Sequence, residues 1–281
     1  MAAVALALGA SLAWGVSDFY AGLQSRRLPL LTVLAVSQAV GLAVIALIVA
    51  ARGHGPPSAG PLALAAASAL AGLGGLAAFY RGLAVGAMSV VAPVSATAAA
   101  IPVAYGLATG DRPTALQAAG MASALVGVIL ASREEDPERG GRGTRLAAGF
   151  GLALIAALGF GTFFVAIGRA SDHGPLWAIL ANRVAGVALL WTVVGLRRPK
   201  LGLGRGSGGP LAAIGCLDMG ANAGYALATT QGLVSLVAVL ASLYPAVVIA
   251  LAHLVLGERI RPSQRVGVAA ALAGVAMIAA G

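Results

Sequence analysis

Charged residues are scarce in this chain of 281 residues: Asp, Glu, Lys and Arg together make up 10% of it, while hydrophobic residues make up 59%. The mean hydropathy is +0.94. A soluble globular domain has about 25% charged and about 45–50% apolar residues, so this chain lacks the polar residues that a surface in water requires. The composition excludes an ordinary cytosolic enzyme and a disordered tail, and it indicates a protein of the lipid bilayer.

Cysteine is nearly absent as well. The single one, Cys216, lies within an apolar stretch and has no second cysteine with which to pair, which excludes a disulfide scaffold. The segment that begins at Met1 has no basic region and no cleavage site that would introduce a polar mature protein. We therefore interpret this segment as a first spanning helix and not as a signal peptide.

Catalytic motifs are missing too. The sequence has no His-Glu-x-x-His, and no Gly-x-Ser-x-Gly accompanied by a plausible base. The two aspartates within apolar stretches, Asp18 and Asp218, lack the Tyr-Asp and Gly-x-Gly-Asp contexts of an aspartyl membrane protease. We predict that the protein is not an enzyme and that it has no catalytic residues, no cofactor and no metal site.

Apolar stretches long enough to cross a bilayer, which takes about 20 residues, fill most of the chain. Glycine and proline punctuate the short connections between them, which leaves no room for a soluble domain. We count ten such stretches, at residues 2–23, 30–51, 61–85, 87–109, 113–132, 146–169, 175–196, 210–233, 235–256 and 263–280. The predicted fold class is an all-α integral membrane protein with ten transmembrane helices.

The two halves of the sequence resemble each other. Because the offset is nearly constant over five spans, we interpret residues 1–132 and 146–281 as two repeats joined by a charged linker at 133–145. Five is an odd number, so the second repeat enters the membrane from the opposite side, as in alternating-access carriers with a site between the halves. A shift of 146 or 147 residues aligns Trp14-Gly15 with Phe160-Gly161, Gly22 with Gly168, Pro29 with Pro175, Gly86 with Gly232, and Gly110-Asp111-Arg112 with Gly257-Glu258-Arg259.

Several short motifs carry a family resemblance over essentially the whole chain. They are Trp14-Gly15 in the first span, Tyr80-Arg81-Gly82-Leu83-Ala84 at the end of the third, Pro245 ahead of Gly257-Glu258-Arg259, and a glycine-rich last span in each half. With these motifs the chain resembles the EamA-type proteins of the drug/metabolite transporter superfamily. The resemblance implies a secondary-active transporter with two inverted five-helix repeats around a central cavity. It leaves the substrate open, because similar proteins export amino acids, take up or expel metabolites, or handle cationic drugs.

The first half departs from the family pattern at two positions. Ala99 stands where the second half has Pro245, and Asp111 replaces the usual Glu. We expect Pro93 and Pro102 to supply the bends in the fourth span instead.

Positive charge is distributed unevenly between the two sides of the predicted bundle. The formal net charge is +9. The even-numbered loops hold three basic residues, Arg52, Arg112 and Arg169, whereas the odd-numbered loops hold fourteen. Family members are usually drawn with their termini inside the cell, but the positive-inside rule places the odd loops in the cytoplasm and both termini outside. We follow the charge count and expect a multi-pass protein of a bacterial-type plasma membrane, the inner membrane of the cell, with non-cytoplasmic termini.

Three charged residues lie well inside spans: Asp18, Arg183 and Asp218. A charge at membrane depth costs at least about 2.5–3.5 kcal/mol, so it normally faces a cavity and has a function. Asn222 and Tyr225 follow Asp218 at helical spacing and form a polar stripe with it on an apolar helix. Such a stripe is typical of a helix that lines water or substrate.

This imbalance of two acids and one base suggests a binding site. If Arg183 neutralises one carboxylate, the other is free to bind either a proton or a cationic group. We predict that Asp18 or Asp218 binds the ammonium of a small zwitterion or cation and couples it to protons, while Arg183 holds a carboxylate. The predicted substrate-binding residues, which include the walls of the site, are Trp14, Asp18, Phe160, Phe164, Arg183, Asp218, Asn222 and Tyr225.

Other interpretations stay open. Asp218 and Arg183 could form a purely structural ion pair, and Asp18 could reach the membrane interface. A multidrug cation exporter is the main alternative to an amino-acid or metabolite carrier, and a substrate-free scaffold or lipid scramblase is an alternative from another class. The expected partners are a small-molecule substrate and the lipid bilayer, not nucleic acid, and a monomer should suffice because one chain supplies both halves of the cavity.

Overall fold

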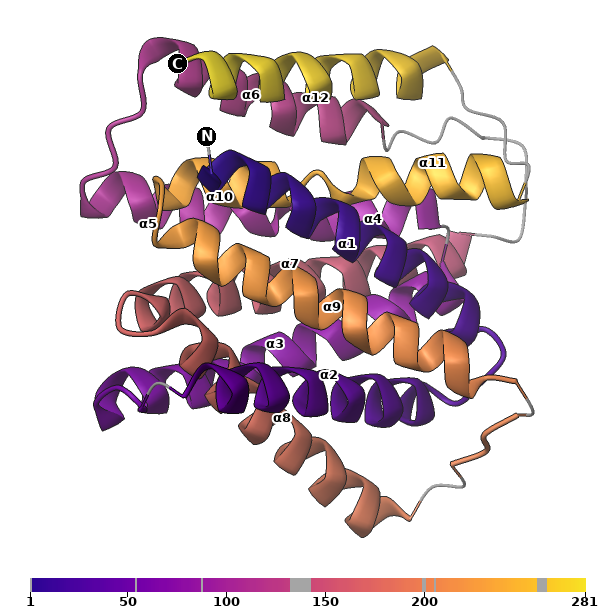
Figure 1. The fold of residues 1–281 in the computed structure, drawn as a ribbon. Coiled ribbons are helices and arrows are strands. Elements are labelled where there is room, and N and C mark those ends of the chain that lie inside the picture. Colours follow the sequence, from indigo (N-terminus) through magenta and orange to yellow (C-terminus); the bar gives the residue numbers. More distant parts are fainter. Residues whose placement is uncertain are drawn as a thin grey trace.

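The computed structural model describes residues 2–53, 55–86, 88–131, 143–198, 201–204, 206–256 and 262–281. Within these ranges all regular structure is helical, and most helices run side by side along one direction (Figure 1). The first half contains α1 (Ala2–Ser25), α2 (Leu30–Arg52), α3 (Ala59–Val85), α4 (Met88–Ala96), the 3-10 turn η1 (Thr97–Ala99), α5 (Ala100–Thr109) and α6 (Ala115–Ala131). The second half contains α7 (Gly143–Ser171), α8 (Pro175–Arg197), α9 (Gly208–Thr229), α10 (Val234–Ala241), α11 (Tyr244–Leu256) and α12 (Pro262–Ala280).

Two of the predicted spans are broken in the middle. Residues 87–109 are divided into α4 and α5 by Thr97–Ala99, and residues 235–256 into α10 and α11. Pro102 and Pro245 each lie in the first turn of the helix after the break. A proline at that place loses no helical hydrogen bond, because the first N–H groups of a helix have no partner within it.

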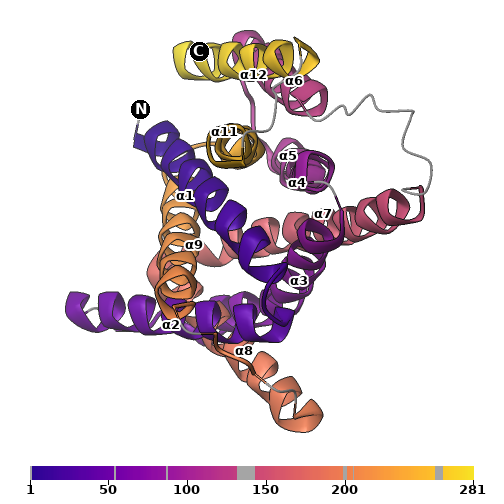
Figure 2. The same ribbon diagram turned by 90° about the vertical axis from the view of Figure 1, so that its right-hand side faces the viewer.

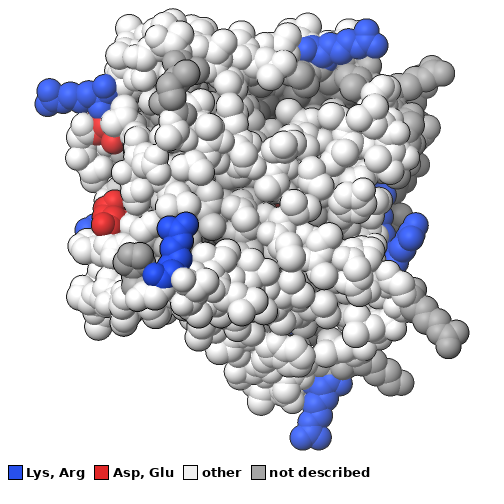
Figure 3. Space-filling model, viewed as in Figure 1, with Lys and Arg blue, Asp and Glu red and all other residues white. Residues whose placement is uncertain are grey.

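Seven stretches among the described residues are long and apolar enough to cross a membrane, with α10 and α11 counted together as residues Val234–Val255. The remaining apolar helices, Val94–Thr109, Ala115–Gly127 and Arg265–Ile278, are shorter. Charged side chains visible in Figure 3 lie near the edges of the molecule, and the broad face between them carries none. Such a surface is unsuited to water and suited to lipid.

Parts of two predicted features lie outside the described residues. They are residues 133–142 of the predicted linker and the turn Gly257-Glu258-Arg259. Gly143–Arg145, which we also assigned to the linker, form the start of α7. Both ends of the chain lie near each other at one end of the bundle (Figures 1 and 2).

Small residues allow the helices to pack closely. α6 and α12 lie against each other at the edge of the molecule (Figure 2). A methyl group added at Gly120 would lie 2.8 Å from the carbonyl oxygen of Gly274, and the Ser123 hydroxyl donates a 2.8 Å hydrogen bond to the carbonyl of Ala270. Contacts of this kind stabilise helix pairs in lipid, where the hydrophobic effect does not draw helices together.

The other helices surround the interior. α1 packs against α9, α3 packs against α7, and α2 and α8 contact each other and close the lower side in Figure 2. α4 and α5 contact α10 and α11 on the opposite side. This arrangement places the middle of α1, α3, α7, α8 and α9 around a common space.

Candidate functional site

A cavity lies in the middle of the bundle, with about 670 Å³ of empty space including solvent-open space at its border. Seven helices contribute to its wall, so it is formed by both halves of the chain. The lining residues are Trp14 and Asp18 of α1, Gln38 of α2, Ala69, Gly72, Leu73 and Leu76 of α3, Phe160, Phe163 and Phe164 of α7, Asn182, Arg183 and Gly186 of α8, Asp218 and Asn222 of α9, and Tyr244 of α11.

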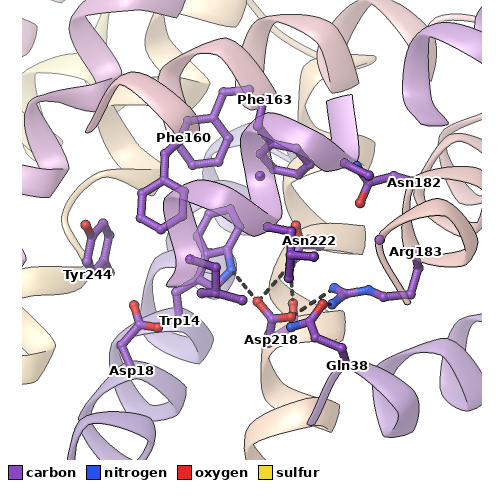
Figure 4. Close-up of a pocket in the computed structure, with 16 residues that line it drawn as sticks. Trp14, Asp18, Gln38, Phe160, Phe163, Asn182, Arg183, Asp218, Asn222 and Tyr244 are labelled. Carbon is purple, nitrogen blue, oxygen red and sulfur yellow. Dashed lines mark hydrogen bonds and ion pairs between the residues drawn. The ribbon is translucent and has the colours of Figure 1, made fainter. Parts of the chain in front are cut away.

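Asp218 and Arg183 form a buried ion pair at one side of this cavity (Figure 4). The distance from Nη2 of Arg183 to Oδ2 of Asp218 is 2.9 Å, and the two residues are 5% and 7% exposed. Oδ1 of Asp218 accepts hydrogen bonds from Nε1 of Trp14 at 3.3 Å and from Nδ2 of Asn222 at 3.0 Å. The Asp218 carboxylate is therefore compensated by one cation and two further donors, as a buried charge requires.

Gln38 extends this network from α2. Nη1 of Arg183 donates a hydrogen bond to Oε1 of Gln38. Within the described part of the chain, Nε of Arg183 and Nε2 of Gln38 have no hydrogen-bond partner although both atoms are buried. Both residues contribute to the cavity wall, and each keeps one N–H donor that other described residues leave unused.

Asp18 is the second carboxylate of the cavity, and its surroundings differ from those of Asp218. It lies in α1, one turn after Trp14, and is 6% exposed. No hydrogen bond or ion pair joins its carboxylate to another side chain in the described ranges. In Figure 4 its carboxyl group lies apart from the ion pair, on the side of Tyr244. A buried carboxylate without a counterion is costly as an anion, so it requires a proton or a cation.

Aromatic rings form the wall next to these polar groups. The ring centres of Trp14 and Phe164 are 5.5 Å apart, and those of Phe160 and Phe164 are 6.4 Å apart. The Tyr244 hydroxyl lies 2.6 Å from the Ser95 hydroxyl of α4, so this phenol is held by a hydrogen bond across the two halves. Rings placed near a free carboxylate suit a cationic amine, whose positive charge is attracted to their faces.

The structure brings together seven of the eight predicted substrate-binding residues. Trp14, Asp18, Phe160, Phe164, Arg183, Asp218 and Asn222 all line the cavity. Tyr225 is not among the lining residues. It is fully buried behind the wall, with its ring centre 4.7 Å from that of Phe164 and 6.0 Å from that of Trp14.

The predicted set of substrate-binding residues leaves out four lining residues with functional side chains, Gln38, Phe163, Asn182 and Tyr244. Gln38, Asn182 and Tyr244 are polar residues within apolar spans, so a signal existed, but isolated polar residues in spans more often tie helices together. Asn182 does make such contacts, donating 2.9 Å and 3.3 Å hydrogen bonds to Ser68 and the carbonyl of Ala65. Phe163 has no signal of its own, because it is one of two adjacent phenylalanines on an apolar helix.

The donor chemistry of the cavity suits an organic ligand. Within the described ranges, no group of three or more His, Cys, Asp or Glu residues is arranged to hold a metal ion. The cavity instead offers one free carboxylate, that of Asp18, and several aromatic and aliphatic surfaces.

Comparison with known proteins decides the family. The sequence profile of the EamA-like transporter family matches residues 1–133 and again residues 147–280. The chain belongs to the EamA-like transporter family. This EamA-like chain is accordingly a multi-pass membrane protein and a transporter of the drug/metabolite type. The family is generally not enzymatic.

Other comparisons bear on the fold of this EamA-like protein. A solved structure described as a crystal structure of protein has a similar fold, with a TM-score of 0.75. The alignment covers 98% of this chain and 95% of that one. The two sequences are 18% identical, so the likeness concerns the fold alone. No curated protein matches the sequence significantly.

Proposed function

We propose that this protein is a secondary-active transporter that exchanges a small amine-bearing metabolite, an amino acid or a related zwitterion or cation, for protons by alternating access. The observation that carries the proposal is the buried Asp18 carboxylate, which has no counterion among the described residues and lies in an aromatic cavity beside an ion pair that is already neutral. Export is the direction we propose.

Alternating access is supported by matching contacts in the two halves. Gly15 packs against the backbone of Tyr244, and Gly161 packs against the backbone of Ala98. A methyl group added at either glycine would lie 2.8 Å from the carbonyl oxygen of its neighbour. Gly161 follows Gly15 by 146 residues, and Tyr244 follows Ala98 by the same number. The shift between the proposed repeats therefore converts one contact into the other.

The exchange of the two proposed repeats also relates contacts between whole helices. The shift that takes α1 to α7 takes α3 to α9, and the contact of α1 with α9 has its counterpart in the contact of α3 with α7. The contact of α6 with α12 is converted into itself. An exchange that converts these contacts into equivalent ones is a pseudo-twofold relation. It supports ten spans in two inverted repeats, as expected of a carrier that opens alternately to each side.

Coupling follows because a proton and the cationic group of the substrate compete for the Asp18 carboxylate. The Asp18 carboxylate is stable in this cavity when it carries a proton or when a cation lies beside it, and the two exclude each other. A carrier that reorients only with Asp18 occupied therefore moves a substrate in one direction and a proton in the other. Arg183 and Gln38 line the cavity and each keep one N–H donor without a partner among the described residues, and we propose that they hold the carboxylate of a zwitterion.

A multidrug cation exporter is the second candidate, and one observation favours it. Arg183 is held by Asp218 and Gln38, so its charge is already compensated before a ligand arrives. A ligand with an ammonium and a flat apolar body would use Asp18 and the aromatic wall alone.

Transport into vesicles with an acidic lumen tests the proposal and separates the two candidates. We expect purified protein in liposomes to accumulate labelled leucine or labelled tetraethylammonium, and nigericin to abolish the accumulation by collapsing the pH gradient. Exchange of a zwitterion for a proton moves net charge, so a membrane potential should change its rate, whereas exchange of a monovalent cation for a proton is electroneutral. Equal uptake with and without the pH gradient would contradict proton coupling.

The orientation that we propose rests on charge. Fourteen basic residues in the odd-numbered loops against three in the even-numbered ones support termini outside the cytoplasm of a bacterial-type cell. We expect a C-terminal alkaline phosphatase fusion to be active and a C-terminal green fluorescent protein fusion to be dark. The reverse pattern would place the termini in the cytoplasm and leave the binding site proposal unaffected.

A further inference from the structure

The two halves of the cavity are equivalent in position and opposite in chemistry. The 146-residue shift takes Trp14 to Phe160, Asp18 to Phe164, and Gly72 to Asp218. All six of these residues line the cavity. Each position that is polar on α1 or α9 is thus matched by an apolar residue on α7 or α3, so the pseudo-twofold relation holds for the backbone and not for the wall of the site.

This difference gives the cavity two distinct ends. The polar end holds Asp18, the Arg183–Asp218 pair and Asn222. The apolar end is formed by Gly72, Leu73 and Leu76 of α3 and by Phe160 and Phe163 of α7. Asn182 of α8 borders this end, where its amide is bonded to Ser68 and Ala65 of α3. Figure 4 shows the side chains of Phe160 and Phe163 across Trp14 from the polar cluster.

We infer that the substrate is amphiphilic and binds in one orientation, with its charged head toward α1 and α9 and its apolar substituent against α3 and α7. Gly72 and Phe163 set the length of that substituent. A methyl group added at Gly72 would lie 3.0 Å from Cδ2 of the Phe163 ring, which is closer than ordinary packing allows. Any side chain at position 72 must therefore displace the ring or occupy the space that the substituent uses. The inference rests on the proposed function, because it assigns the head to Asp18.

A series of n-alkyltrimethylammonium ions, from tetramethyl to hexyl, measures the two ends separately. Binding to the purified full-length protein in lipid nanodiscs is followed by calorimetry. Each buried methylene contributes about fourfold in affinity, so we expect the affinity of the wild-type protein to rise by that factor per methylene until the apolar end is filled. In Gly72→Ala the rise should stop at a shorter chain.

Gly74 provides the matched control. It lies on the same helix and is exposed, and a methyl group added there would have no neighbour within 4 Å. Gly74→Ala should therefore reproduce the wild-type series. Asp18→Asn should weaken all members by a similar factor and leave the increment per methylene unchanged, since it alters the head site alone.

Phe163→Leu keeps the test decisive if Gly72→Ala does not fold. Its smaller side chain leaves more space at the apolar end, so the affinity should continue to rise for ligands with longer alkyl chains. An unchanged chain-length profile in the folded Gly72 variant, or in the Phe163 variant, overturns the inference and leaves the proposed function standing. A profile shortened by Asp18→Asn would reverse the orientation and also overturns it. Failure of all members to bind the wild-type protein would overturn the proposed function together with the inference.

Discussion

Asp18→Asn is expected to abolish proton-driven accumulation in vesicles. The substituted amide cannot bind a proton, so a pH gradient has no group on which to act in the cavity. It also cannot compensate a cation, and removing one partner of a desolvated charge pair costs about 2–5 kcal/mol, which corresponds to a loss of at least about 30-fold in affinity for a cationic substrate. Uptake against the pH gradient and equilibrium binding measure the two effects separately.

The dependence on pH has a defined sign. In the wild-type protein, lowering the pH on the side from which the substrate binds should weaken binding, since protons and the cationic group compete for Asp18. In Asp18→Asn the remaining binding should not change with pH. Asp172→Asn is the matched control, because Asp172 is an exposed carboxylate just beyond the end of α7. Undiminished gradient-driven uptake by the Asp18 variant would exclude this residue from coupling.

Most of the fold could be predicted because bilayer physics constrains it strongly. A spanning segment must be helical and about 20 residues long, so apolar length indicated the helical stretches, of which seven among the described residues are long enough to span. The break of residues 235–256 falls at Ser242 and Leu243, just ahead of Pro245. The break of residues 87–109 falls at Thr97–Ala99, between the two prolines from which we expected bends, Pro93 and Pro102. The sequence indicated that this span would be irregular but not where it would break.

The site residues were predictable only where placing the side chain inside the membrane costs free energy. Asp18, Arg183 and Asp218 were identified because a charge in a span requires a reason, but their pairing depends on how α8 meets α9, which spacing within one helix does not determine. Gln38 reaches Arg183 from a third helix, a contact that no local pattern indicates. Tyr225 was assigned to the wall by helical spacing, yet it is fully buried and packs against Phe164, which lines the cavity in its place. The helical repeat predicts which residues share one face of a helix, whereas tertiary packing determines which of them reach the cavity.

The two aspartates have different roles by this reasoning, although both lie on cavity-lining helices. Asp218 accepts hydrogen bonds from Arg183, Trp14 and Asn222, so it is already compensated without a ligand. Asp18 has no such partner in the described residues. Asp218 therefore organises the site and fixes the Trp14 ring, while Asp18 is the group with a charge still to be matched.

Loss of one member of the Arg183–Asp218 pair should be the most destabilising change in the cavity. Asp218→Asn leaves the guanidinium buried without a counterion, and breaking a buried pair in this way costs about 3–5 kcal/mol. We expect a marked fall in the midpoint of thermal unfolding, measured by fluorescence in detergent. Arg183→Met leaves the Asp218 carboxylate unpaired, and it should lower the unfolding midpoint by a similar amount.

The double variant separates a structural pair from a ligand site. Arg183→Met with Asp218→Leu removes both charges and replaces them with apolar side chains of comparable bulk, so its stability should exceed that of either single variant. Arg197→Met is the control, because Arg197 is an exposed arginine of the same helix and its replacement should change stability little. If Asp218 served chiefly to bind substrate, Asp218→Asn would instead keep the wild-type unfolding midpoint and lose binding alone. Additive effects in the double variant would likewise show that the two charges do not support each other.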